Sequence, residues 1–167
     1  MRNLVLGLGN MLLADEGVGV HVAQRLLEDR RHDDSVVLDV GNALLDAMPA
    51  IAAAERVIVV DAMKGGGPPG TVYRVPLAEC ANADSIASVH GFDVTSVLHL
   101  TGRDDAPEVV VIGIEPDVIS WSTELSEAVA AAVPDALAAV EIELTGEPPE
   151  ERTTPPRTTR RDATCHR

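Results

Sequence analysis

Three residues that stand far apart in this chain carry side chains able to bind a metal ion or move a proton. Glu16 follows a glycine-rich turn in LGLGNMLLADEGVGV, Asp61 closes the apolar run RVIVVDA, and His90 stands in SVHGF. Two carboxylates and one imidazole suit an open site for a borderline divalent cation. A cation held in this way polarises a carbonyl and acidifies water. Glu16, Asp61 and His90 are therefore candidate metal ligands and catalytic groups, and they permit metal-assisted hydrolysis.

Each of these residues also fits a structural role. Acidic residues at the start of a helix offset the positive end of its dipole, by about 0.3–1 kcal/mol each. We assign that role to Asp15, as the helix N-cap, which leaves Glu16 to point into a cleft. Asp61 equally suits a turn that follows a strand, and His90 suits a helix cap or an exposed position. The residues alone leave these alternatives open.

Nucleophilic side-chain catalysis has little support in the sequence. His21 and His99 lie inside expected helices, where we give them structural roles. Cys80 and Cys165 have neither a metal-like nor a disulfide-framework spacing. The GxSxG motif of a nucleophilic serine does not occur.

Nucleotide binding is an alternative that the first turn suggests. Gly7-Leu8-Gly9 begins like a dinucleotide fingerprint, but Leu12 stands where the third glycine is required. Asp15 and Glu16 would face the pyrophosphate at the helix start, and a like-charge pair ~4 Å apart costs about 4 kcal/mol at an effective dielectric constant near 20. A lone GxG is also a weak signal. Nucleotide binding is therefore the weaker hypothesis.

The elements that must position these residues alternate along the chain. Apolar runs predict strands, and amphipathic or alanine-rich segments predict helices. The expected strands are Asn3–Gly9, Ser35–Val40, Arg56–Ala62, Thr71–Val75 and Glu108–Ile114. The expected helices are Gly17–Arg31, Leu44–Glu55 with Pro49 in its first turn, Phe92–Leu100, and Thr123–Leu144, which Pro134 kinks or divides. By composition, MKGGGPPGT is expected to be a mobile loop.

This alternation predicts an α/β domain with a mostly parallel sheet covered by helices on both faces. The carboxyl ends of parallel strands share one edge of the sheet, where ligands bind. Glu16, Asp61 and Glu115 all stand just beyond or at the end of a strand. The topology therefore allows distant residues to meet at that edge.

Length and charge limit the domain organisation and the partners. We expect one domain over residues 1–145 and a disordered tail rich in Pro, Thr and Arg over residues 146–167. The whole chain has a net charge of −14, and residues 1–145, with 23 acidic and 8 basic residues, have −15. Such a surface repels nucleic acid and anionic lipid. No apolar stretch approaches the ~20 residues of a membrane helix, and we expect a cytoplasmic protein.

The motifs together resemble those of the hydrogenase maturation proteases, which process the large subunit of nickel–iron hydrogenase. LGLGNMLLADEGVGVHVAQRL is similar to the family's N-terminal signature, and VIVVDAMKGGGPPGTVYRV to its second block. SVHGFDVTSVL resembles the third block, and VIGIEPDVISWSTELSEAV the Gly-Ile-Glu-Pro segment with the helix after it. Four blocks in the right order are far more specific than any single motif.

The resemblance implies a three-layer fold with a twisted, mostly parallel five-stranded sheet. It also implies an aspartic-type or metal-dependent endopeptidase whose metal-contacting residues are Glu16, Asp61 and His90. The ion is nickel supplied by the substrate, the large-subunit precursor, from which a C-terminal extension is removed. Gly41-Asn42 replaces the family's glycine–glycine–threonine turn, so the identity of the partner is less defined. Nothing in the pattern requires a dimer, and we expect a monomer.

Two other functions remain as alternatives. One is a non-catalytic α/β module that binds a nucleotide or a metal ion. The other is a related peptidase with another substrate, such as a spore-protein protease.

Overall fold

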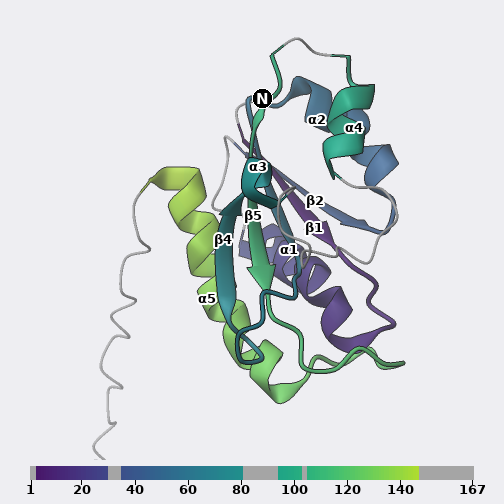
Figure 1. The fold of residues 1–167 in the computed structure, drawn as a ribbon, viewed down its shortest axis with the longest axis vertical. Helices are drawn as coiled ribbons and strands as arrows, with labels where there is room; N and C mark the ends of the chain where they lie inside the picture. Colours follow the sequence, from purple (N-terminus) through teal and green to yellow (C-terminus); the bar gives the residue numbers. More distant parts are fainter. Residues whose placement is uncertain (1–2, 30–34, 81–93, 103–104, 147–167) are drawn as a thin grey trace, which may run out of the picture.

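A single sheet organises the molecule. The computed structural model describes residues 3–29, 35–80, 94–102 and 105–146, which form a five-stranded sheet in the order β2-β1-β3-β5-β4 (Figure 1). The strands are β1 (Asn3–Leu8), β2 (Ser35–Gly41), β3 (Arg56–Ala62), β4 (Val72–Pro76) and β5 (Glu108–Ile114). The strands β1, β2, β3 and β5 run parallel, and β4 pairs antiparallel with β5. The predicted mostly parallel sheet is confirmed.

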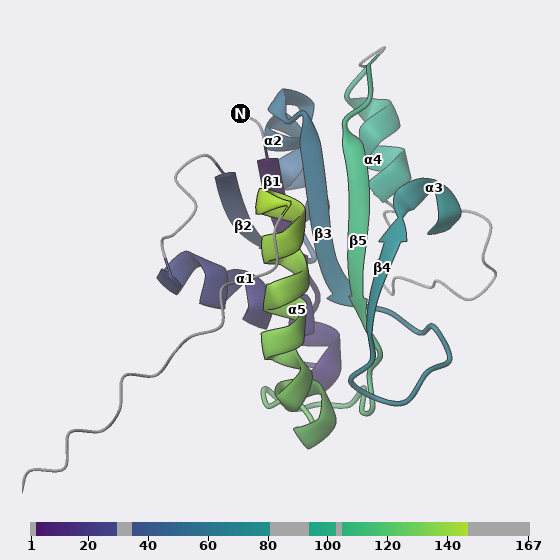
Figure 2. The same ribbon diagram turned by 90° about the vertical axis from the view of Figure 1, so that its left-hand side faces the viewer.

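Helices cover both faces of this sheet, as predicted. The helices of the described chain are α1 (Val18–Asp29), α2 (Met48–Ala53), α3 (Leu77–Cys80), α4 (Val94–Leu100) and α5 (Glu127–Thr145), with the 3-10 helices η1 (Ala14–Gly17) and η2 (Leu44–Ala47). Apolar residues of α1 and α5 pack on one face, and those of η2, α2 and α4 pack on the other. Figure 2 shows α1 and α5 in front of the sheet and α4 behind it. The fold therefore has three layers.

The central strands are buried because both of their faces carry apolar side chains. In β3 the residues Val57 to Val60 are at most 2% exposed, and alternate residues belong to the two cores. A parallel strand covered on both faces has this continuous apolar sequence. The bounds of β3 and β5 are those predicted from the sequence.

The helix that contains Pro134 is continuous. Proline inside a helix removes one hydrogen bond and crowds the preceding turn, yet α5 extends unbroken from Glu127 to Thr145. Its buried residues lie on both sides of Pro134 and pack against the same core, with Val129 and Ala132 before it and Ala136 and Val140 after it. Packing on the sheet thus holds both halves in one helix.

The first helix begins differently from the prediction. The chain enters α1 through η1, in which Asp15 and Glu16 are the second and third residues.

Residues 30–34 and 81–93, and the predicted tail from residue 147 onward, lie outside the described residues. No helix within the described part of the chain is long and apolar enough to cross a membrane.

Candidate functional site

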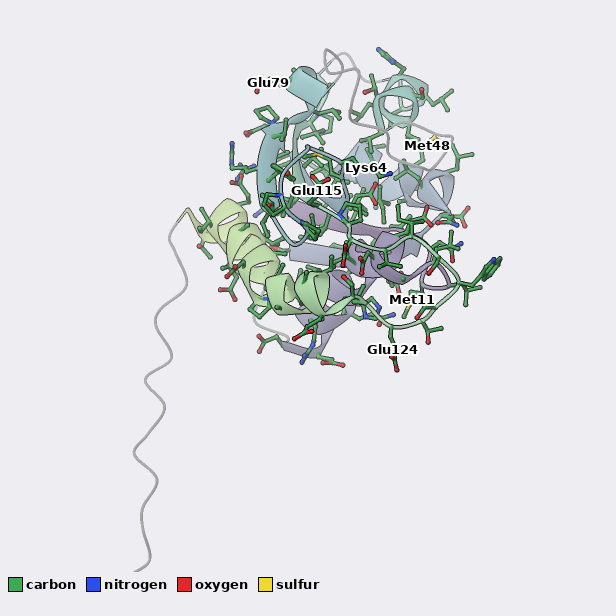
Figure 3. The ribbon with its side chains drawn as sticks, turned by 60° about the horizontal axis from the view of Figure 1, so that its bottom comes forward. Met11, Met48, Lys64, Glu79, Glu115 and Glu124 are labelled. Atoms are coloured by element: carbon green, nitrogen blue, oxygen red, sulfur yellow. The ribbon has the colours of Figure 1, made fainter. Side chains whose placement is uncertain are left out.

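Three segments meet at the carboxyl edge of the sheet, and we name them by their residues. The acidic turn (residues 9–17) follows β1, the glycine loop (residues 63–71) follows β3, and the exit loop (residues 115–126) follows β5. Figure 3 looks onto this edge from below. It is the edge at which the sequence predicted the site.

The first glycine of the acidic turn, Gly9, is required by the protein's own backbone. Gly9 has φ +128°, and a Cβ there would lie 1.9 Å from the carbonyl oxygen of Glu16. Its N–H donates to the carbonyl of Gly41 at 3.1 Å, joining the ends of β1 and β2. The turn folds closely over its own glycine, so this glycine has a reason to be present that involves no phosphate group.

Glu16 and Asp61, two of the three predicted site residues, come close enough to interact. Asp61 is 5% exposed at the end of β3, and Glu16 is 2% exposed in η1. Burial, with a smaller contribution from the charge of Glu16, raises the pKa of Asp61 from its ordinary value of 3.8 to about 7. The N–H of Ala62, which donates to Asp61 Oδ1 at 2.8 Å, acts in the opposite direction. A carboxyl group in this state exchanges its proton near neutral pH.

The side chain of Asp61 lies on the face of the sheet that carries α2 and α4. Side chains alternate along a strand, and Asp61 follows Val57 and Val59, which pack in the core with Val94 and Val97 of α4. The third predicted site residue, His90, precedes α4 in the sequence but lies outside the described residues. Its role therefore stays a prediction.

Glu16 and Asp61 do not make a closed metal site by themselves. Among the residues that the structure describes, no group of three or more His, Cys, Asp or Glu side chains is placed to hold a metal ion. A carboxylate pair of this kind would need a further donor, from residues outside the described part or from a substrate.

Asp15 does not cap the helix, so this prediction was wrong. The 3-10 helix η1 follows Leu13 with no side-chain cap. Asp15 Oδ2 accepts hydrogen bonds from the N–H groups of Asp117, at 2.9 Å, and Val118, at 2.7 Å, and Oδ1 accepts one from Ser126 at 2.7 Å. Because η1 places Asp15 inside a turn, its carboxylate faces the exit loop. Asp15, 0% exposed, fastens that loop to the acidic turn.

Glu115 orders the glycine loop, a role that the sequence did not reveal. Its Oε2 accepts a hydrogen bond from the N–H of Gly65 at 2.6 Å and another from the Tyr73 hydroxyl at 2.8 Å. Burial alone would raise its pKa, but these bonds, with those from the N–H groups of Gly66 and Gly67, lower it. The only sign of this role in the sequence is that an acidic residue directly follows a buried strand.

Further hydrogen bonds hold the backbone of the glycine loop, which was expected from its composition to be mobile. The N–H of Met63 donates to Ile114 at 2.9 Å, and that of Gly70 donates to the carbonyl of Glu115 at 2.8 Å. The N–H of Gly67 donates to the Tyr73 hydroxyl at 2.8 Å. Composition predicted mobility, but β5 and Tyr73 supply partners for this backbone. The loop that borders Asp61 is therefore held at both of its ends.

The sequence matches known proteins over most of its length. A family model described as "HycI: Hydrogenase maturation protease" matches residues 20–143. The chain is 34% identical over 150 residues to the hydrogenase expression/formation protein HupD of Rhodobacter capsulatus, covering 86% of this chain and 71% of that protein. It is 32% identical over 144 residues to the hydrogenase 2 maturation protease of Escherichia coli strain K12, covering 82% and 87%.

Solved structures give the same result for the fold. The [NiFe] hydrogenase maturation protease HybD from Thermococcus kodakarensis superposes with a TM-score of 0.74 at 30% identity, covering 86% of this chain and 99% of that one. The maturating endopeptidase HybD from Escherichia coli gives a TM-score of 0.70 at 30% identity, covering 87% and 94%. Both similarities extend over nearly the whole described fold.

Proposed function

This chain belongs to the hydrogenase maturation protease family, and from this premise we propose that it is an endopeptidase that removes the C-terminal extension of a nickel–iron hydrogenase large-subunit precursor after nickel insertion. The observation that carries the proposal is the pair of buried carboxylates, Glu16 and Asp61, at the carboxyl edge of the sheet. Ligands of open α/β sheets bind at this edge.

We assign recognition of the nickel ion to Glu16, Asp61 and His90. The ion belongs to the precursor and is part of the substrate. Two carboxylates and one imidazole suit a borderline divalent ion, and such a set binds less tightly than a closed structural site. Weak binding suits an enzyme whose product leaves with the ion. Protein purified without precursor should accordingly hold little metal.

Asp61 is the residue to which we assign proton transfer. Hydrolysis joins a water oxygen to the peptide carbonyl carbon and breaks the C–N bond, while a proton passes from the water to the leaving amine. In the protein without nickel, the carboxyl group of Asp61 titrates at about pH 7 and so both accepts and returns a proton in neutral solution. This supports an aspartic-type, metal-dependent endopeptidase.

The partner and the setting follow from the same proposal. The partner is the nickel–iron hydrogenase large-subunit precursor, and the protease acts on it as a monomer in the cytoplasm. The turn at Gly41-Asn42 is expected to contact the precursor. Gly41, with φ +54°, accepts the Gly9 hydrogen bond beside the acidic turn, and Asn42 is exposed next to it.

A cleavage assay with two forms of the precursor tests this function. We expect the wild-type protein to shorten nickel-loaded precursor and to leave nickel-free precursor intact. Asp61→Asn and Glu16→Gln should abolish cleavage, measured as a mass change of the precursor, while retaining the circular dichroism of the folded protein. Asp46→Asn, an exposed carboxylate of η2, is the matched control and should cleave normally.

Each alternative has its own outcome in this assay. Full cleavage by Asp61→Asn or Glu16→Gln would contradict the assigned site. Failure of the wild-type protein to cut loaded precursor, together with tight binding of a dinucleotide, would support the non-catalytic module. Chelator-resistant, stoichiometric zinc in protein purified without precursor would contradict a metal that arrives with the substrate.

A further inference from the structure

Four large apolar side chains are exposed together on the acidic turn and the exit loop. Trp121 is 82% exposed and Leu12 52%, while Val118 and Ile119 are 41% and 40% exposed. We name these four residues the apolar patch. Trp121 is the single tryptophan of the chain, and its ring contributes little to the core. Exposed clusters of this kind mark interaction sites more often than isolated apolar residues do.

Hydrogen bonds between the two loops hold the apolar patch in place. The N–H of Ser122 donates to Leu12 at 3.0 Å, and that of Ala14 donates to Ser122 at 2.8 Å. Three further bonds to the Asp15 carboxylate hold the exit loop. Figure 3 shows Met11 and Glu124, from the two loops, on the same side of the molecule. A surface ordered before binding loses less entropy when a partner docks.

The apolar patch is joined to the proposed catalytic residues. Asp15, which anchors the exit loop, is the direct neighbour of Glu16, and Glu16 interacts with Asp61. The apolar patch and Glu16 are thus carried by the same two bonded loops, at the edge of the sheet where Asp61 ends β3.

The charges around the apolar patch indicate what kind of partner fits. Residues 9–17 and 115–127 contain no Lys or Arg, and Asp117, Glu124 and Glu127 are exposed. In a symmetric dimer the same patch would face itself, so these acids would oppose their own copies on chains that each carry −14. A partner with apolar side chains beside basic residues has the complementary chemistry.

We propose that the apolar patch docks the segment of the hydrogenase precursor next to its scissile bond, through apolar side chains flanked by basic residues. This inference rests on the proposed function, since it names the surface by which the same site holds its substrate. Trp121 is the central contact, because exposed tryptophans that become buried dominate binding at many interfaces. Its role is to bind the precursor and not to take part in the bond-breaking step.

Kinetics of Trp121→Ser on nickel-loaded precursor provide the first test. We expect KM to rise about tenfold or more, the usual cost of truncating a central interface residue, with kcat within about twofold of wild type. Leu27→Ala is the matched control, since Leu27 is 48% exposed on α1 and belongs to neither loop. An unchanged KM for Trp121→Ser, with normal cleavage, would overturn the docking surface and leave the proposed function intact. Absence of cleavage by every variant and by the wild type would instead overturn the proposed function.

The single tryptophan also allows binding to be observed directly. Protein labelled with 5-fluorotryptophan has one fluorine resonance, from position 121. With Asp61→Asn to prevent cleavage, adding unlabelled nickel-loaded precursor should shift or broaden that resonance, and Glu124→Gln should reduce the salt dependence of the effect. A sharp, unmoved resonance in a complex isolated by gel filtration would contradict the proposal. A resonance that depends on protein concentration without precursor would indicate self-association and would equally contradict it.

Discussion

Asp61 occupies a position where its negative charge is unfavourable for folding. Its carboxyl group is 5% exposed and lies near Glu16, and its pKa is about 7 where 3.8 is ordinary. The folded protein therefore binds a proton that the unfolded chain releases between these two pH values. A residue that serves only the structure would not need an ionisable group at a buried position. A carboxyl group whose ionised form is disfavoured by burial is typical of sites where the group transfers protons.

This conflict predicts that Asp61→Asn stabilises the protein in a pH-dependent way. The stability contributed by protonated Asp61 is fully present below pH 3.8 and is lost as the pH rises through about 7. The complete loss is of the order of 4 kcal/mol, at 1.36 kcal/mol per pKa unit. Asparagine cannot ionise, so the Asp61→Asn variant does not lose this stability as the pH rises. We expect Asp61→Asn to raise Tm by about 5 °C more at pH 8 than at pH 5, since 1 kcal/mol shifts Tm by about 2–4 °C in a domain of this size.

Thermal denaturation followed by circular dichroism at both pH values measures this difference. Asp46→Asn, which removes an exposed carboxylate, serves as the control and should shift Tm alike at the two pH values. If Asp61→Asn changed Tm equally at pH 5 and pH 8, the carboxyl group would not have the raised pKa on which its proposed role depends.

At the scale of elements, Asp15 links two segments that are distant in sequence. Its carboxylate accepts hydrogen bonds from the backbone N–H groups of Asp117, Val118 and Ser126, which lie 102, 103 and 111 residues further along the chain. The acidic turn and the exit loop are thereby one unit, which carries both Glu16 and the apolar patch. An N-cap would stabilise only its own helix, by about 1 kcal/mol. The capping role expected from the sequence and the anchoring role found in the structure therefore predict different effects of substituting Asp15.

Asp15→Ser separates these roles. Serine is a good helix N-cap, so a capping role would be retained at little cost. Its single hydroxyl oxygen cannot replace two carboxylate oxygens that accept three backbone hydrogen bonds, and hydrogen bonds to a charged group contribute about 1.5–3 kcal/mol each. We expect Asp15→Ser to lower Tm by at least about 5 °C and to speed hydrogen exchange in residues 117–126. A Tm within about 2 °C of wild type would contradict the anchoring role.

The sequence predicts the strands well because their signal is local. An uninterrupted run of Val and Ile with polar residues at its ends defines β3 and β5 within the chain itself. The same pattern, with parallel topology, correctly brought Glu16 and Asp61 to one edge. These features require no knowledge of distant contacts.

The roles of Asp15 and Glu115 could not be predicted, because their partners are backbone N–H groups. Every residue other than proline has such a group, so a sequence carries no mark of which one a distant carboxylate will accept. The glycine loop is a second case in which the sequence does not reveal the contacts. Its composition suggests only mobility, whereas Tyr73 and Glu115 accept hydrogen bonds from its backbone N–H groups. The continuous α5 likewise depends on tertiary packing that overrides Pro134.

At the scale of the whole molecule, an ionic cluster joins α5 to the sheet at the end opposite the candidate site. Glu143 of α5 is 5% exposed and pairs with Arg56 of β3 and with Arg74 of β4, the latter at 2.5 Å. This cluster fastens the last turns of α5 to two strands. Within the described residues, this attachment lies a few residues before the end of α5.

The helix then ends at a glycine suited to stop it. Gly146 has φ +76°, and its N–H donates to the carbonyl of Ile142 at 2.7 Å. Glycine is favoured at this left-handed position because it has no Cβ. Among the described residues, α5 contributes apolar side chains to the core as far as Val140 and the partly buried Leu144.

A chain that ends after Gly146 should therefore fold and cleave as the full chain does. Residues 147–167 carry four acidic and five basic residues, so their removal changes the net charge only from −14 to −15. A change of one charge hardly alters the long-range attraction of a partner segment that contains basic residues. We expect Tm within about 2 °C and kcat/KM within about twofold. A chain that ends after Ala139 is the contrasting variant, since it lacks Val140, Glu143 and Leu144, and it should unfold at a much lower temperature. If removing residues 147–167 raised KM with Tm unchanged, this segment would belong to the precursor-binding surface, and the domain relevant to function would be longer than residues 1–145.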